Sequence, residues 1–139
     1  MKQSRQYPKV MISPKAERSV RNGHPWIYGE EILNTEGLLQ NGGQVDVFAG
    51  KAFMGTGFYN STSKITVRLI SRNANDVFDA RFWRRRVEYS VRYRKTVMPG
   101  LDFNCCRLIH GEADQMPGLT VDRYGTILSV QITCLGMEL

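Results

Sequence analysis

Seven residues between positions 15 and 26 are of the types that contact nucleic acid. They are Lys15, Arg18, Arg21, Asn22, Gly23, His24 and Trp26. Cations on one helix face can neutralise phosphates, and a glycine at the helix end lets a sugar-phosphate backbone approach closely. A nearby aromatic ring or imidazole can stack on an unpaired base. The pattern favours RNA contact over its alternative, a solvated helix face; for Trp26 taken alone, a core position is favoured.

A second basic group lies between positions 81 and 95, where Glu88 is the only acid. Its cations are Arg81, Arg84, Arg85, Arg86, Arg92, Arg94 and Lys95. A face that includes Arg84 and Arg85 could contact phosphates or dock another domain. The alternative is a solvated amphipathic helix whose basic side chains cover apolar surface with their stems.

The run from Arg107 to Gly125 holds one histidine and several charged residues, which could suggest an acid/base or metal cluster. The spacing is not that of a metal site, and such residues are common in surface turns. We expect Arg107, Asp114 and Asp122 to form a structural network of ion pairs and hydrogen bonds that ties strands together. No catalytic residue and no metal ligand is predicted.

Composition narrows the choice of partner and compartment. The chain has 139 residues and a formal net charge of +6, which favours an anionic partner such as nucleic acid, although solubility alone also accounts for it. No apolar run is long enough to cross a bilayer, and no apolar segment follows the basic N-terminus. We expect a cytoplasmic protein without membrane contact. The odd number of cysteines, 3, predicts buried free thiols.

The elements that position these residues follow from local signals. Ser13-Pro14 predicts the start of a helix that ends near Asn22-Gly23. A strand-like stretch at 10–12 precedes this helix, and further ones with glycine-rich turns follow it at 45–48, 52–59 and 65–71. Together they predict a small β barrel. A GxG lies within 54–57, but no helix follows it, so nucleotide binding is not predicted there.

The pattern changes after a polar joint at 73–76. Asp79 predicts the N-cap of a helix over 80–97, and Pro99-Gly100 predicts its end. The predicted apolar stripe of this helix consists of Trp83, Val87, Ser90, Val91 and Val97, and it is flanked by Phe82, Tyr89 and Tyr93. Strands are then expected near 104–109, 119–122 and 127–133.

Three motifs carry a resemblance to a known family: His24-Pro25-Trp26-Ile27, Gly57-Phe58-Tyr59-Asn60 and the run Arg107–Gly125. The chain resembles the N-terminal part of bacterial SAM-dependent methyltransferases that make 5-methylcytosine in 23S ribosomal RNA. The resemblance covers residues of about 9–137. It implies an α+β chain with a PUA-like pseudobarrel at 1–75. The basic helix and a β-hairpin, at 76–139, would begin the family's α/β middle domain.

The resemblance also implies a division of labour. PUA domains typically bind RNA at the early helix and the segment after it. In the family, S-adenosylmethionine and the catalytic cysteine belong to a C-terminal domain, and no position here matches either. We therefore expect an RNA-binding targeting module, with ribosomal RNA as partner and no cofactor in this chain. Whether the chain takes part in catalysis stays open.

The alternative is a non-catalytic structural or partner-binding remnant that docks on a separate methyltransferase chain. Exposed apolar surface around 127–139 would favour that reading. An unpaired strand edge there could also produce a homodimer.

Overall fold

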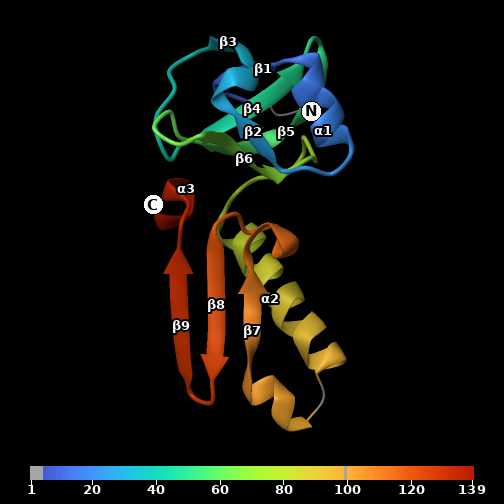
Figure 1. Cartoon of the computed structure of the whole chain (residues 1–139), viewed down its shortest axis with the longest axis vertical. Helices are drawn as coiled ribbons and strands as arrows, with labels where there is room; N and C mark the ends of the chain where they lie inside the picture. The colour runs from blue at the N-terminus through green and yellow to red at the C-terminus, as the bar shows by residue number, and fades with distance from the viewer. Residues whose placement is uncertain (1–4, 99) are drawn as a thin grey trace. The chain divides into compact units, whose positions relative to one another are not determined.

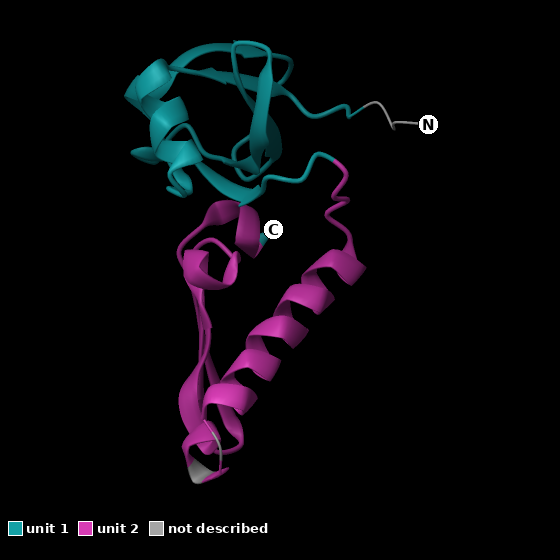
Figure 2. Ribbon diagram, turned by 90° about the vertical axis from the view of Figure 1, so that its right-hand side faces the viewer, with its two compact units in different colours: residues 1–74, 139 teal, residues 75–138 magenta. Residues whose placement is uncertain are grey.

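The computed structural model describes residues 5–98 and 100–139, which form two compact units (Figure 2). Residues 5–74 make the first unit and residues 75–138 the second. Two parts of the sequence lie outside the described residues: Pro99, which was predicted to end a helix, and residues 1–4 of the basic N-terminus. The architecture is α+β, as predicted: a curled six-stranded sheet with a helix, then a long helix with a second, smaller sheet (Figure 1).

The first unit contains a six-stranded sheet, one α-helix and a short 3-10 helix. Its elements are β1 (Lys9–Ile12), α1 (Pro14–Arg21), β2 (Trp26–Tyr28), η1 (Gly29–Glu31), β3 (Ile32–Glu36), β4 (Gln44–Ala49), β5 (Ala52–Tyr59) and β6 (Ile65–Ser71). The strand order is β2-β6-β5-β4-β1-β3. The β1–β4 pair is parallel, and the other pairs are antiparallel.

Local sequence sets both ends of α1. The Ser13 hydroxyl oxygen accepts a hydrogen bond from the Ala16 amide at 3.3 Å, and Pro14 occupies the first turn. Asn22 is the C-cap, one residue beyond the helix, and Gly23 follows with φ +100°. Because a left-handed backbone is easiest for glycine, the chain can turn there into β2.

Alternating apolar side chains fill the first unit's core. Val10, Val47 and Val67 come from three strands and are fully buried. Ala16 and Val20 bury one face of α1 against the same cluster, which leaves the basic face outside. Burying one such side chain contributes about 1.5–3 kcal/mol, so this packing fixes the orientation of α1.

The GxG segment lies within β5. This agrees with the prediction that no helix follows it. A Cβ added to Gly57 would lie 2.6 Å from the Arg68 carbonyl oxygen, and one added to Gly55 would lie 2.7 Å from that of Ser71. These glycines therefore allow β5 and β6 to approach closely. They are packed inside the sheet.

The second unit combines a long helix with a three-stranded sheet. Its elements are α2 (Ala80–Val97), η2 (Gly100–Asn104), β7 (Cys105–His110), η3 (Gly111–Asp114), β8 (Leu119–Tyr124), β9 (Ile127–Ile132) and α3 (Leu135–Glu138). The strands are antiparallel in the order β7-β8-β9. The Asp79 carboxylate caps α2 by accepting from the Phe82 amide at 2.8 Å.

The buried face of α2 agrees only in part with the predicted apolar stripe. Ser90, a member of the stripe, is 4% exposed, whereas Val87 and Val97 are 39% and 49% exposed. Arg94, which lies outside the predicted stripe, is 9% exposed. Trp83 packs against the apolar cluster Leu108, Ile109, Met116 and Val121. The Arg94 side chain can be buried because its guanidinium forms an ion pair with the Asp114 carboxylate of η3.

The prediction of buried thiols is correct for Cys134 and wrong for Cys105, which is exposed; Cys106 is half-buried. Cys105 and Cys106 are adjacent on β7 and therefore project to opposite faces. No helix in the described part of the chain is long and apolar enough to cross a membrane.

Candidate nucleic-acid interface

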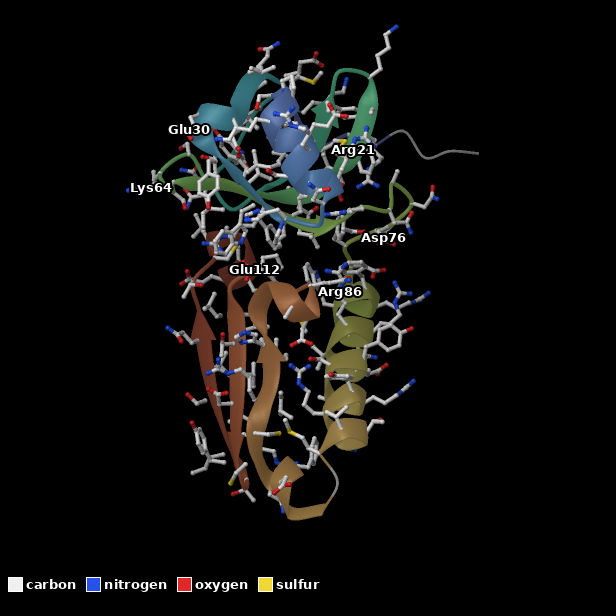
Figure 3. All side chains as sticks on the ribbon, turned by 45° about the vertical axis from the view of Figure 1, so that its right-hand side comes forward. Arg21, Glu30, Lys64, Asp76, Arg86 and Glu112 are labelled. Carbon is white, nitrogen blue, oxygen red and sulfur yellow. The ribbon has the colours of Figure 1, made fainter. Side chains whose placement is uncertain are left out.

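The predicted interface residues of the first unit lie along α1, from Lys15 near its start to Arg21 at its end, and in the segment after it. Six of them are exposed: Lys15, Arg18, Arg21, Asn22, Gly23 and His24. Figure 3 shows Arg21 at the surface near the end of the helix. Trp26 is half-buried, between the core position favoured by sequence and a fully open one. Ile27, its neighbour on β2, is the fully buried residue.

A surface hollow of about 270 Å³ unites part of this set. It is lined by Lys15, Ser19, His24, Trp26, Tyr28, Glu30 and Glu31. Lys15, His24 and Trp26 were predicted, whereas Arg18 and Arg21 lie outside the lining. Sequence reasoning missed Tyr28, although it follows Trp26 by two residues and shares its strand face.

His24 and Trp26 hold each other in place beside this hollow. Their rings meet edge to face, with centroids 5.7 Å apart at 82°. The Trp26 amide donates to His24 Nδ1 at 3.3 Å. In the neutral imidazole the proton then sits on Nε2, which leaves an N–H donor on an exposed ring. Arg68, paired with Trp26 across the sheet, lies 5.4 Å from the indole centroid.

The charged groups around α1 are exposed or weakly paired, apart from Glu31. Arg21 donates to Glu17 at 2.8 Å, an i,i+4 pair on the surface. Such exposed pairs contribute about 0.3–0.5 kcal/mol, so a phosphate can displace the carboxylate. Glu31 is 6% exposed and accepts from the Tyr28 amide at 3.0 Å, which makes it a structural group. Glu30 is exposed and can accept from the amino group of a base.

The basic residues of α2 divide between an outer and an inner face. Arg84 and Arg85 are exposed. Arg86, labelled in Figure 3, is partly covered. Its guanidinium lies 4.2 Å from the Phe82 ring centroid and donates to the Gln115 carbonyl of the turn after η3. Burial lowers the pKa of Arg86 to about 10, against an opposing effect of Asp76. The group is still a cation at neutral pH.

Arg94 and Asp114 form an ion pair that sequence reasoning missed. Arg94 donates from Nη1 and Nη2 to the two Asp114 oxygens at 2.5 and 2.7 Å. Burial would raise the pKa of Asp114, but hydrogen bonds from Arg94 and the His110 amide hold it below its ordinary value. The hydrogen bond to Asp114 raises the pKa of Arg94.

Arg107 and Asp122 face each other across β7 and β8. Arg107 Nε and Nη2 donate to the carboxylate at 2.8 and 3.1 Å, and this pairing lowers the pKa of Asp122. His110 links the two pairs: its Nδ1 lies 3.3 Å from Arg107 Nη1, and its amide donates to Asp114 at 2.6 Å. Arg107, Asp114 and Asp122 were predicted to belong to one network. In the structure, Arg107 pairs with Asp122, and the ion-pair partner of Asp114 is Arg94.

The Arg107–Gly125 run is thus occupied by structural contacts. Within residues 5–98 and 100–139, no group of three or more His, Cys, Asp or Glu is placed to hold a metal ion. At α1 and β2 the chain presents cations, aromatic rings and hydrogen-bonding groups, and α2 presents a further basic face.

Comparison with known proteins assigns the first unit. Residues 10–72 match the family model described as a PUA-like domain. Ribosomal RNA large subunit methyltransferase I of Alteromonas mediterranea is 32% identical over 131 residues, which are 94% of this chain and 33% of the relative. The Shewanella denitrificans protein of that name is 33% identical over 132 residues, again 94% of this chain and 33% of the relative.

Solved structures share the fold over nearly the whole chain. A candidate SAM-dependent methyltransferase from Streptococcus mutans superposes with a TM-score of 0.79 at 20% identity, over 94% of this chain and 34% of its own. A candidate methyltransferase complexed with SAH gives 0.78 at the same identity and coverage. The chain spans about a third of the length of the relatives it matches. Residues 10–72 are thus similar to PUA-like domains, and the chain is similar to the N-terminal part of ribosomal RNA large subunit methyltransferase I.

Proposed function

We propose that this chain is the RNA-binding, targeting part of a methyltransferase that modifies cytosine C5 in large-subunit ribosomal RNA. The observation that carries the proposal is the hollow beside α1, where Lys15, His24 and Trp26 meet on the surface of a PUA-like domain. The names of the relatives support ribosomal RNA as the target.

The residues fit unpaired RNA better than a duplex. Arg18 and Arg21 can neutralise phosphates that pass the end of α1. The half-buried Trp26 ring and the exposed His24 ring can stack on a splayed base, whereas a duplex hides its base faces. The charges of Arg18 and Arg21 also offset the negative end of the α1 helix dipole, which would otherwise repel a phosphate there.

We assign no residue of this chain to S-adenosylmethionine. In the family that the sequence resembles, a glycine-rich turn receives this methyl donor. Gly55 and Gly57 do not fit that role, because both are enclosed by β6 backbone. Catalysis would belong to the part of the longer relatives that lies outside the match.

Salt-dependent RNA binding tests the proposal. Fluorescein-labelled fragments tiled along 23S ribosomal RNA would be titrated with the full chain at several salt concentrations, with DNA duplex as control. Arg18→Glu should weaken binding and reduce the salt slope by about one. Lys51→Glu makes the same charge change on the exposed β4–β5 turn and should have little effect. Equal effects of the two variants would contradict an interface at α1.

A second function is supported by the sheet of the second unit. Val130 pairs with Val121 across β8 and β9, so both project from the same sheet face. Val121 is buried in the cluster under α2, whereas Val130 is 57% exposed. Leu128 and Ile132 extend the open part of that face and are 58% and 43% exposed.

We propose that this open face docks the methyltransferase part that the relatives have beyond the matched third. The apolar face is continuous with the core, and an uncovered extension of a core face is typical of an interaction site. A second copy of the chain is the competing occupant, and the oligomeric state separates the two.

A further inference from the structure

Two tyrosines on α2 are far more open than the flanking positions of an apolar stripe would be. Tyr89 and Tyr93 are 58% and 60% exposed. They are four residues apart on the helix and therefore lie one above the other on the same side. The Arg94 guanidinium lies 5.4 Å from the Tyr93 ring centroid, and more than half of each tyrosine remains open to a ligand.

A hollow of about 200 Å³ lies against these rings. It is lined by Arg86, Tyr89, Ser90, Tyr93, Ala113, Asp114 and Gln115. Pockets that enclose small molecules usually measure about 300–1,000 Å³. This hollow is smaller and better suited to one planar group laid against the tyrosines.

The floor of the hollow is already satisfied by internal bonds. Asp114 is neutralised by Arg94, and the Ser90 hydroxyl donates to the Leu108 carbonyl at 2.7 Å. Gln115 lines the rim, is exposed, and has an amide that can both donate and accept. A ligand would therefore meet two ring faces and one amide, and it would not have to displace the ion pair.

The positive charge of α2 around the hollow favours an anionic ligand. Glu88 is the one acid within α2. The exposed cations of the helix are Arg81, Arg84, Arg85, Arg92 and Lys95. The Arg92 guanidinium lies 5.9 Å from the Tyr89 ring centroid, so a cation borders the rings directly. Planar groups linked by phosphates are the ligand that suits rings bordered by cations.

We propose that Tyr89 and Tyr93 form a stacking site for unpaired bases of single-stranded RNA, with Arg92 and Arg85 on adjacent phosphates and Gln115 at the base edge. The site rests on the proposed RNA-binding function and adds a contact in the second unit, separate from α1. An acidic protein segment would satisfy the cations but would not use the rings.

The test uses the full chain and a 12-nucleotide single-stranded RNA with 2-aminopurine near its centre. Stacking on a tyrosine quenches the fluorescence of that base. Replacing Tyr89 or Tyr93 by Ala should weaken binding by about 5-fold or more and remove the quenching, by the magnitude of base–aromatic stacking. Tyr89→Phe should retain both, since the ring remains. Tyr124→Ala, at a tyrosine that is also 58% exposed, should change neither.

An abasic RNA of the same length separates ring contacts from charge. Wild type and Tyr93→Ala should bind it equally, because only phosphates remain. Unchanged affinity and quenching in both Ala variants, with RNA binding itself intact, would overturn the stacking site and leave the proposed function standing. Equal tyrosine dependence for a poly-glutamate peptide would also overturn it. If the wild-type chain bound no RNA at all, both proposals would be refuted.

Discussion

Arg94 and Asp114 share two hydrogen bonds, of 2.5 and 2.7 Å, that join α2 to the turn after β7. Arg94 also donates to the Arg107 carbonyl at 3.1 Å and to the Ser90 hydroxyl at 3.1 Å. One guanidinium therefore holds the helix, a strand and the η3 turn together. This contact forms the floor of the hollow beneath Tyr89 and Tyr93.

Removing Arg94 should destabilise the second unit strongly. Arg94→Met leaves the Asp114 carboxylate without its cation in a poorly hydrated position. Loss of one partner from a buried pair costs about 3 kcal/mol or more. Urea unfolding followed by Trp83 fluorescence in a Trp26→Phe background would report the second unit alone.

Arg107→Met is the matched control, since it breaks a pair in which the arginine side chain is 47% exposed. Its effect on the urea midpoint should be much smaller. Equal losses in the two variants would mean that burial of the Arg94–Asp114 pair is unimportant. Adding Asp114→Leu to Arg94→Met should recover part of the lost stability, because the unpaired charge is then gone.

Acid should destabilise the second unit through Asp114. The folded-state pKa of this carboxyl is below its ordinary value, so the unfolded chain binds more protons as pH falls. Its contribution is complete above the unfolded pKa, about 3.9, and is lost as pH falls through the folded pKa. Asp114→Asn should be less stable than wild type at pH 7, and the difference should shrink below about pH 4. Urea midpoints at pH 3, 5 and 7 would measure this, and a constant difference would exclude Asp114 as the source.

Helix positions were predictable because their signals are local. Ser13 and Asp79 cap α1 and α2 through amides three residues away, and both were inferred from sequence. β3 was missed because it is an edge strand whose side chains are mostly exposed, so it lacks the apolar alternation of a buried strand.

The inner face of α2 depends on contacts that sequence spacing does not reveal. An arginine in a helix is ordinarily read as solvated, yet Arg94 is buried because Asp114, 20 residues later, meets it. Tyr89 and Tyr93 are open for the related reason that α2 turns its Ser90–Arg94 side to β7. Trp26 and His24 were both named as candidate site residues from the sequence, but their joint hollow with Tyr28 and Glu30 requires the folded chain.

Trp26 should contribute to RNA affinity through its ring. Trp26→Ala should weaken binding of the 23S ribosomal RNA fragment that the wild-type chain binds by about 5- to 150-fold. This corresponds to about 1–3 kcal/mol for one stacked base. Trp26→Phe should retain most of the affinity, since a ring face remains. Fluorescence anisotropy would measure both, with circular dichroism to verify folding. If Phe were as damaging as Ala, the indole would act through the His24 contact and not by stacking.

Association with a methyltransferase part should depend on the open face of β9. Val130→Lys places a charge on that face, whereas Ser129→Lys places the same charge on the opposite face of the same strand. Sedimentation velocity over a hundredfold concentration range would compare both with wild type. If the face docks the rest of a methyltransferase, the wild-type chain should be monomeric, and Val130→Lys alone should weaken its association with a separately produced methyltransferase part of the Alteromonas relative. A concentration-dependent dimer that Val130→Lys abolishes would assign the face to a second copy, because exposed edge strands with apolar faces pair readily with each other.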